Sequence, residues 1–352
     1  MPVRQRVERI CGQGLDARAL RVAVLAEIRT TVPFDSYVWL LTDPETCVGS
    51  DPLAETPSLA DLPALIRLRY LTSLNRWTKL PPDTAVTLVG STNGDRAQSA
   101  MWRELLAGYG IDDVISTVFR DTYGCWGFLE LWRAGAAFSD DECHVLADLT
   151  RVLTRSIRLC QMTTFEGRSA TLEPDGGPAV LLLSDSLDLL SQTPQTDAYL
   201  RALLPTGVDR SPVPAAAYNV AAQLLAQENE VDLHPPWARV HLGDRRWVTL
   251  RAARIKRGSA VDPATIAVSI EPTPPIERTE LYGRVVGLSE RESQLLRHLV
   301  AGSDTRQLAQ RLFVSEHTVQ DHLKSIFLKT GVNSRRLLIA RATGLAERTV
   351  VD

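Results

Sequence analysis

The C-terminal part of the chain constrains the fold most, because the ends of successive helices can be placed there from single residues. Residues 288–343 show no strand pattern, and their apolar positions recur at helical spacing. Ser289, followed three positions later by glutamate, forms a capping box, and Gly302 occupies the position of a left-handed helix C-cap. Asp304 and Ser315 are suited to cap two further helices. The very short turn between these two helices predicts a helix-turn-helix.

The third predicted helix of this segment has a polar outer face. Projection at about 100° per residue places Val319 and Leu323 on the apolar side of the helix. Reading base edges in a major groove requires an exposed row of hydrogen-bonding side chains on the other side. The residues on that side are His317, Thr318, Asp321, Lys324, Ser325 and Leu328. Lys329, Arg335 and Arg336 are better placed to neutralise phosphates, which supply affinity rather than sequence specificity.

Charge is unevenly distributed along the chain. Residues 282–352 contain 11 Lys and Arg against 7 Asp and Glu, which gives a formal charge of +4. The preceding residues 1–281 contain 28 against 35, which gives −7. Because many solvated helical faces are mildly basic, this excess favours a nucleic-acid partner without establishing one.

Residues 288–342 resemble the LuxR-type helix-turn-helix domain, also described as LuxR/NarL-like. The matching motifs are LSERE at 288–292, LA at 308–309, SEHTVQDHL at 315–323, IFLKTGV at 326–332 and SRRLLIARA at 334–342. In that family the third helix enters the major groove, and its base-facing positions fall on Gln320, Asp321 and Lys324 of this chain. The family often has lysine directly after the Thr-Val pair, where this chain has Gln320. That difference removes one positive charge and leaves the target sequence undefined.

This resemblance implies a transcriptional regulator that binds double-stranded DNA as a homodimer. The fourth helix, residues 334–343, commonly supports dimerisation in the family. A related tri-helical module also occurs in sigma factors, so the alternative is a sensor that contacts sigma factor or RNA polymerase without reading DNA directly. A steep loss of binding to a random duplex with rising salt distinguishes the first interpretation from the second.

Two stretches that combine proline with glycine or acidic residues, 171–179 and 270–277, are typical of linkers and divide the chain. The predicted organisation is a sensor domain over 1–170, a second domain over 177–271, a linker over 272–283 and a helix-turn-helix domain over 284–348. The predicted fold class is multidomain, with two α+β domains followed by an all-α domain of four helices.

The first segment has the pattern of a helix, an antiparallel sheet and a closing helix. Residues 15–32 have the period of an amphipathic helix that Pro33 stops. Residues 113–120 and 125–133 are rich in β-branched or aromatic residues, which predicts neighbouring strands. Ser139 opens the closing helix with a second capping box.

The second segment repeats this theme in different proportions. Two short strands are expected around Ser184–Ser186, followed by helical runs near 196–204 and 214–227. Gly243 and Asp244 separate two further strand-like runs, which is typical of a hairpin, and TIAVSIE supplies another strand.

The first segment resembles a GAF domain of the kind found ahead of LuxR-type domains in actinobacterial regulators. The matching stretches are 32–46, 108–133 and 138–149. The second segment is PAS-like in its order of strand, helix and hairpin, or is a GAF-like extension. Both folds usually hold a small effector or a partner against one face of the sheet, although aromatic residues in strands mostly pack in cores. The candidate ligand-binding residues are Trp39, Trp126 and Trp132.

Other kinds of chemistry find little support in the sequence. The five cysteines are scattered and never spaced as C-x-x-C, so we expect no disulfide framework, no metal site and a reducing cytoplasm. We find no apolar run long enough for a membrane span and no phosphate loop, G-x-S-x-G or H-E-x-x-H motif. We therefore expect a cytoplasmic protein without enzymatic activity, cofactor or membrane contact. Haem ligation by His144, His234 or His241 stays open.

Overall fold

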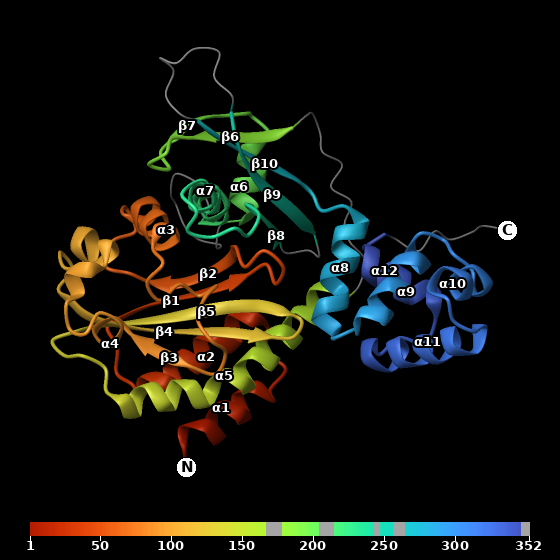
Figure 1. Ribbon diagram of the computed structural model, residues 1–352, viewed down its shortest axis with the longest axis horizontal. Helices are drawn as coiled ribbons and strands as arrows, with labels where there is room; N and C mark the ends of the chain where they lie inside the picture. Colours follow the sequence, from red (N-terminus) through yellow and green to blue (C-terminus); the bar gives the residue numbers. More distant parts are fainter. Residues whose placement is uncertain (167–177, 204–214, 243–245, 256–264, 346–352) are drawn as a thin grey trace. The chain divides into compact units, whose positions relative to one another are not determined.

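The computed structural model describes residues 1–166, 178–203, 215–242, 246–255 and 265–345 (Figure 1). Within these residues the chain forms two five-stranded sheets, each with its own helices, followed by a group of helices. The predicted order of α+β segments followed by an all-α segment is confirmed. Among the described residues, none of the helices combines the length and the apolar character that a membrane span requires.

The first sheet is antiparallel and has the strand order β2-β1-β5-β4-β3. Its strands are β1 (Ser36–Thr42), β2 (Gly49–Glu55), β3 (Ala85–Thr87), β4 (Ile111–Asp121) and β5 (Gly124–Ala134). The predicted pair of neighbouring strands is confirmed as the β4–β5 hairpin. Because side chains alternate along a strand, Phe128, Glu130 and Trp132 lie on one face of the sheet and the leucines between them on the other.

Helices cover both faces of this sheet (Figure 1). They are α1 (Val3–Cys11), α2 (Ala17–Arg29) and α5 (Asp140–Cys160) on one face, α3 (Leu62–Leu71) on the other, and the short α4 (Leu88–Ser91) beside β4. α2 begins after Asp16, whose side chain accepts hydrogen bonds from two backbone N–H groups of the first turn. The predicted capping box before α5 is confirmed, because Ser139 and Glu142 each accept the other's backbone N–H.

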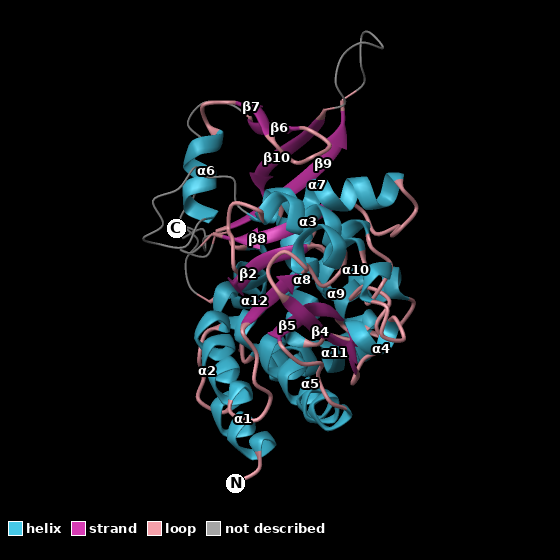
Figure 2. Cartoon of the chain, turned by 90° about the vertical axis from the view of Figure 1, so that its left-hand side faces the viewer, coloured by secondary structure: helices cyan, strands magenta, loops and turns pink. Residues whose placement is uncertain are grey.

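The second sheet has the strand order β7-β6-β10-β9-β8 (Figure 2). Its strands are β6 (Ala179–Leu183), β7 (Leu189–Gln192), β8 (Trp237–His241), β9 (Trp247–Arg254) and β10 (Ile266–Pro272), and its helices are α6 (Thr196–Leu203) and α7 (Ala215–Glu228). When the strands of each sheet are numbered from one to five along the chain, both sheets have the order 2-1-5-4-3. The hairpin turn predicted at Gly243 and Asp244 lies outside the described residues.

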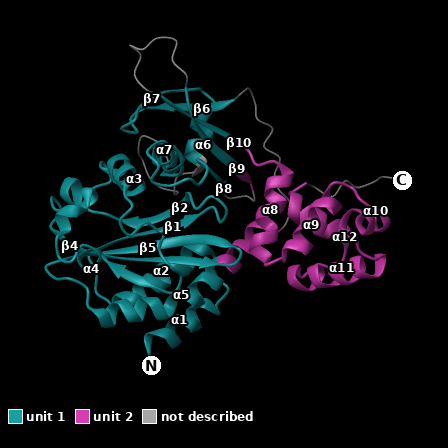
Figure 3. Ribbon diagram, viewed as in Figure 1, with its two compact units in different colours: residues 1–157, 174–240, 248–271 teal, residues 158–173, 241–247, 272–352 magenta. Residues whose placement is uncertain are grey.

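The two α+β segments are joined into one compact unit. Helix α7 belongs to the second segment but packs on α3 and β2 of the first. Asn219 on α7 donates a hydrogen bond to the Gly49 carbonyl oxygen at 3.2 Å, and the buried guanidinium of Arg239 lies 2.7 Å from the Asp43 carboxylate. This unit comprises residues 1–157, 174–240 and 248–271 (Figure 3). The predicted boundary between 1–170 and 177–271 thus separates two sheets but not two compact units.

The second compact unit contains residues 158–173, 241–247 and 272–352. Its helices are α8 (Pro275–Val286), α9 (Glu290–Val300), α10 (Thr305–Leu312), α11 (Glu316–Thr330) and α12 (Arg335–Thr343). The stretch 272–283, which the sequence predicts to be a linker, contains the greater part of α8 from Pro275 onward. Proline is typical of linkers but also fits the first turn of a helix, where its missing N–H costs no hydrogen bond. Leu281 and Tyr282 are buried, which holds α8 against its neighbours.

Candidate nucleic-acid interface and ligand cavity

Helix α11 is held by the cap and the apolar face that the sequence predicts. Ser315 accepts a hydrogen bond from the Thr318 backbone N–H at 3.1 Å, which satisfies one of the free donors of the first turn. Val319, Leu323 and Ile326 are buried. These three residues anchor α11, which contacts α10 and α9, so the opposite side of the helix faces outward.

The connection from α10 to α11 exposes an apolar side chain that the sequence did not mark. Phe313 ends α10 in the left-handed conformation, with φ of 54°, and its side chain is 94% exposed. Leu328 on α11 is 85% exposed. A non-glycine residue with positive φ is uncommon, and this one allows the short turn between the two helices.

The polar outer row of α11 is present as the helical projection predicts. The side chains of His317, Asp321 and Lys324 are 84%, 55% and 72% exposed, and Gln320 is also exposed. The Asp321 carboxylate lies 3.5 Å from the His317 ring and 3.4 Å from the Lys324 ammonium. The row therefore presents one carboxylate between a histidine and a lysine, together with the exposed side-chain amide of Gln320.

Two of the predicted DNA contacts, Ser325 and Lys329, are bonded to a carboxylate of the helical unit in this structure. Glu292 on α9 accepts a hydrogen bond from Ser325 Oγ and forms an ion pair with Lys329 Nζ, both at 2.6 Å. The Glu292 carboxylate also accepts a hydrogen bond from the Ser289 backbone N–H, as part of the capping box. Burial by itself would raise the pKa of Glu292, but the hydrogen bonds from Lys329 and Ser325 outweigh it and lower the pKa to about 2. Projection of one helix could not reveal this contact, because the acceptor lies on another helix.

The remaining predicted contacts lie around the same surface. Thr318 Oγ1 is 2.9 Å from Ser315 Oγ, so its hydroxyl belongs to the helix cap. Arg335 donates to Thr305 Oγ1 at 2.8 Å, whereas the neighbouring Arg336 is exposed. Of the predicted set, the exposed members are His317, Gln320, Asp321, Lys324, Lys329 and Arg336.

The first sheet carries an apolar cavity on the face that α3 covers. Its empty volume, including the mouth, is about 570 Å³, and its walls come from β1, β2, β5, α3 and α7. Of the three tryptophans predicted to bind ligand, Trp132 lines this cavity. Trp39 lies on the other face of β1 and stacks on Phe119 with ring centroids 5.3 Å apart. Trp126 does not line the cavity, and its indole N–H donates to Asp121 at 2.9 Å.

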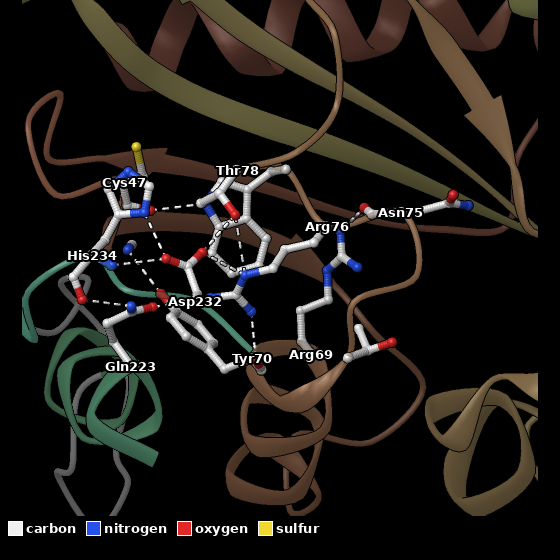
Figure 4. Close-up of polar contacts among 12 residues, drawn as sticks. Cys47, Arg69, Tyr70, Asn75, Arg76, Thr78, Gln223, Asp232 and His234 are labelled. Atoms are coloured by element: carbon white, nitrogen blue, oxygen red, sulfur yellow. Dashed lines mark hydrogen bonds and ion pairs between the residues drawn. The ribbon is translucent and has the colours of Figure 1, made fainter. Parts of the chain in front are cut away.

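A buried polar network next to the cavity connects the two α+β segments (Figure 4). Arg76 Nε lies 2.7 Å from Asp232 Oδ2, and Arg76 Nη2 donates to Gln223 Oε1 at 3.0 Å. Thr78 Oγ1 and the His234 backbone N–H also donate to Asp232, at 2.5 Å and 2.9 Å. Burial would raise the pKa of Asp232, but hydrogen bonds from His234, Thr78 and Arg76 hold it below its ordinary value.

Among the histidines that the sequence left open as haem ligands, His234 is bonded to a carboxylate. His234 Nδ1 lies 2.6 Å from Asp232 Oδ1, which engages one ring nitrogen. In the described parts of the chain, no group of three or more His, Cys, Asp or Glu side chains is placed to hold a metal ion.

Comparison with known proteins finds a family model that matches part of the helical unit. Residues 286–342 match the model of the bacterial regulatory proteins of the luxR family, so the predicted LuxR-type domain is confirmed for this segment. A nitrate/nitrite response regulator protein homolog of Haemophilus influenzae is 37% identical over 60 residues, which span 17% of this chain and 29% of the relative. The likeness is thus confined to less than a third of that protein.

Two solved structures align with the chain at low structural similarity. The crystal structure of Escherichia coli SdiA covers 97% of this chain and 97% of its own, at 12% identity and a TM-score of 0.33. The bacteriophytochrome RpBphP3 from R. palustris covers 76% of this chain and 61% of its own, at 16% identity and a TM-score of 0.29. Both scores are too low to define the fold of the first unit.

Proposed function

We propose that this protein is a DNA-binding transcriptional regulator, in which α11 enters the major groove and α12 forms part of a homodimer contact. The observation that carries the proposal is the outward-facing row of His317, Asp321 and Lys324 on a luxR-family helix-turn-helix. An α-helix fits into the major groove, and exposed donors and acceptors on its outer side can bond the edges of the bases. Arg336 is exposed nearby and is placed to contact phosphate.

The two α+β segments supply the regulatory input in this proposal. Residues 1–170 are assigned as GAF-like and 177–271 as PAS-like, and a small effector bound there biases the helix-turn-helix units between two arrangements. An effector that favours the DNA-competent arrangement by about 100-fold contributes roughly 2.7 kcal/mol, which is enough to switch occupancy of an operator.

The experiment measures binding of the full chain to a fluorescent random duplex across a range of salt concentrations. Affinity is expected to fall steeply with salt, because phosphate contacts release counterions. Lys324→Ala is expected to weaken binding several-fold and to reduce the slope of log K against log salt by about one.

The matched control is Lys79→Ala, which removes an exposed lysine from the first unit. Its affinity and salt slope should equal those of the parent protein. The proposal would be contradicted if the chain bound DNA weakly at low salt and if neither Lys324→Ala nor Lys79→Ala changed the affinity.

A second candidate function is contact with sigma factor or RNA polymerase without direct DNA reading. The exposed side chains of Phe313 and Leu328 favour it, because exposed apolar groups on one small unit are suited to a protein partner. This function predicts that Phe313→Ser lowers affinity for polymerase holoenzyme while Lys324→Ala leaves it unchanged, as measured by pull-down with purified components.

A further inference from the structure

Three buried polar atoms at the cavity of the first unit have no hydrogen-bond partner among the described residues. They are Trp132 Nε1, Arg69 Nε and Asn219 Oδ1. These residues are 0%, 6% and 1% exposed, and all three line the same cavity. They come from β5, α3 and α7, so three separate elements each place a residue with an unpaired polar atom in the wall of one cavity.

Such atoms are rare in folded proteins, because a buried polar group without a partner loses its hydrogen bonds to water. Most of the remaining wall is apolar and includes Val38, Leu40 and Ile66, and the other lining residues with polar side chains are Thr56, Tyr70 and Glu130. The two unpaired N–H groups require an acceptor, and the unpaired amide oxygen requires a donor. A small molecule with both groups and an apolar body matches this lining.

The two charged side chains in the wall of the cavity neutralise each other, which disfavours a charged ligand. The guanidinium of Arg69 forms an ion pair with Glu130, which also accepts a hydrogen bond from Ser116 Oγ at 3.2 Å. The Arg69 guanidinium also lies 5.3 Å from the centre of the Phe128 ring. Because the one cation in the wall is already neutralised by the one anion, a charged ligand would add an uncompensated buried charge.

We propose that this cavity binds a neutral, largely apolar small molecule with a carbonyl-type acceptor for Trp132 and Arg69 and an N–H or O–H donor for Asn219. The inference rests on the proposed function, since it identifies the chemical class of the effector and the site that receives it. Each of the two α+β segments supplies part of the wall, because α7 carries Ala215 and Asn219.

The position of Asn219 connects ligand binding to the packing of the two segments. Its amide nitrogen bonds the Gly49 carbonyl oxygen, and Tyr70, another residue of the wall, accepts the Gly49 backbone N–H at 2.9 Å. Arg76 donates to the Tyr70 carbonyl oxygen and reaches the second segment through Gln223 (Figure 4). A ligand bonded to Asn219 therefore acts on the same contacts that join the segments.

The test uses the full chain with ¹⁵N in its seven tryptophans and follows their indole N–H resonances by NMR. Benzamide is the probe because it is neutral and carries an acceptor and a donor on an apolar ring, and benzoate is the matched anion. The Trp132 resonance, assigned by its loss in Trp132→Phe, is expected to shift saturably with benzamide and to stay unchanged with benzoate at equal concentration.

Two variants report the polar contacts separately. Trp132→Phe and Asn219→Leu are each expected to weaken benzamide binding by about 2- to 10-fold, as expected for one lost hydrogen bond. The control is Trp126→Phe, which removes an indole that already bonds Asp121 and should leave the affinity unchanged. If Asn219→Leu loses the dispersed spectrum of the folded chain, Trp132→Phe decides the question by saturation-transfer titration of the benzamide ring signals.

A Trp132 resonance that does not respond to benzamide, or that responds equally to benzoate, would overturn the assignment. Duplex DNA binding measured on the same samples separates the two proposals. If the chain binds DNA with the expected salt dependence but does not bind benzamide, only the proposed ligand site is wrong. If the chain binds benzamide but not DNA, only the proposed regulatory function is wrong.

Discussion

At the scale of single residues, Glu292 has two roles in the helical unit. It completes the capping box at the start of α9, and it bonds Ser325 and Lys329 on α11. A single buried carboxylate thus fixes the orientation of the helix whose other side carries His317, Asp321 and Lys324.

The acidity of Glu292 gives a stability prediction. Its pKa is about 2 in the folded protein against an ordinary value of 4.5, so the folded state is stabilised at pH values above 4.5. This contribution, on the order of 1 kcal/mol because solvent screens the exposed Lys329 partner, is lost as pH falls from 4.5 toward 2. Glu292→Gln should lower the free energy of unfolding of the helical unit at pH 7 and flatten its dependence on pH in that window, as measured by thermal unfolding.

The matched control for this prediction is Glu290→Gln, which changes an exposed carboxylate on the same helix. It should unfold like the parent protein at both ends of the pH range. Equal pH profiles for the parent and Glu292→Gln would show that the carboxylate contributes no net stability.

At the scale of elements, close approach of β1 and β5 forms the floor of the cavity. Gly127 lies opposite Leu41, and a Cβ placed there would stand 2.6 Å from the Leu40 carbonyl oxygen. Backbone atoms of a central strand pair cannot move aside without breaking the ladder. This contact therefore requires glycine, independently of φ.

Gly127→Ala is expected to destabilise the first unit by about 2 kcal/mol through this overlap. Chemical denaturation followed by tryptophan fluorescence measures the change. Gly12→Ala serves as the control, because its added Cβ would meet the carbonyl oxygens of Arg9 at 3.5 Å and Glu8 at 3.7 Å, which are ordinary contact distances. Equal stability of the two variants would show that the strands can separate without cost.

At the scale of the whole molecule, buried ion pairs unite segments that are distant in the sequence. Arg76 and Asp232 are 156 positions apart, and their side chains are 0% and 3% exposed. Arg239 and Asp43 form a second such pair with both side chains fully buried. Unfolding either segment would expose or unpair these charges, so the two α+β segments should unfold together.

Asp232→Asn leaves the buried charge of Arg76 uncompensated and is expected to lower the stability of the first unit by about 3–5 kcal/mol. The double variant Arg76→Met with Asp232→Leu should cost less than the sum of its two single changes, because neither charge then remains buried alone. Denaturation curves recorded by circular dichroism measure both effects and test for a single transition.

A surface pair in the same unit provides the comparison. Asp197 and Arg201 lie 3.7 Å apart with side chains 48% and 76% exposed, so Asp197→Asn should change stability by less than about 0.5 kcal/mol. Separate transitions of the two α+β segments in the parent protein, in addition to that of the helical unit, would refute the single unit.

The sequence by itself determined the features that depend on neighbouring residues. Ser289, Asp304 and Ser315 mark the starts of helices because a cap needs only the next three residues. The period of apolar residues likewise fixes which side of α11 is buried, and the pattern of β-branched residues locates the β4–β5 hairpin.

Only the tertiary structure decided which side chains meet across the chain. The bond from Lys329 to Glu292, the joining of two predicted domains through Arg76 and Asp232, and the cavity formed by Trp132 with Asn219 all connect distant positions. Such contacts depend on how helices and sheets are placed against each other, and no local period or cap carries that placement. The physical reason is that burial and charge pairing act between surfaces, which exist only once the elements have packed.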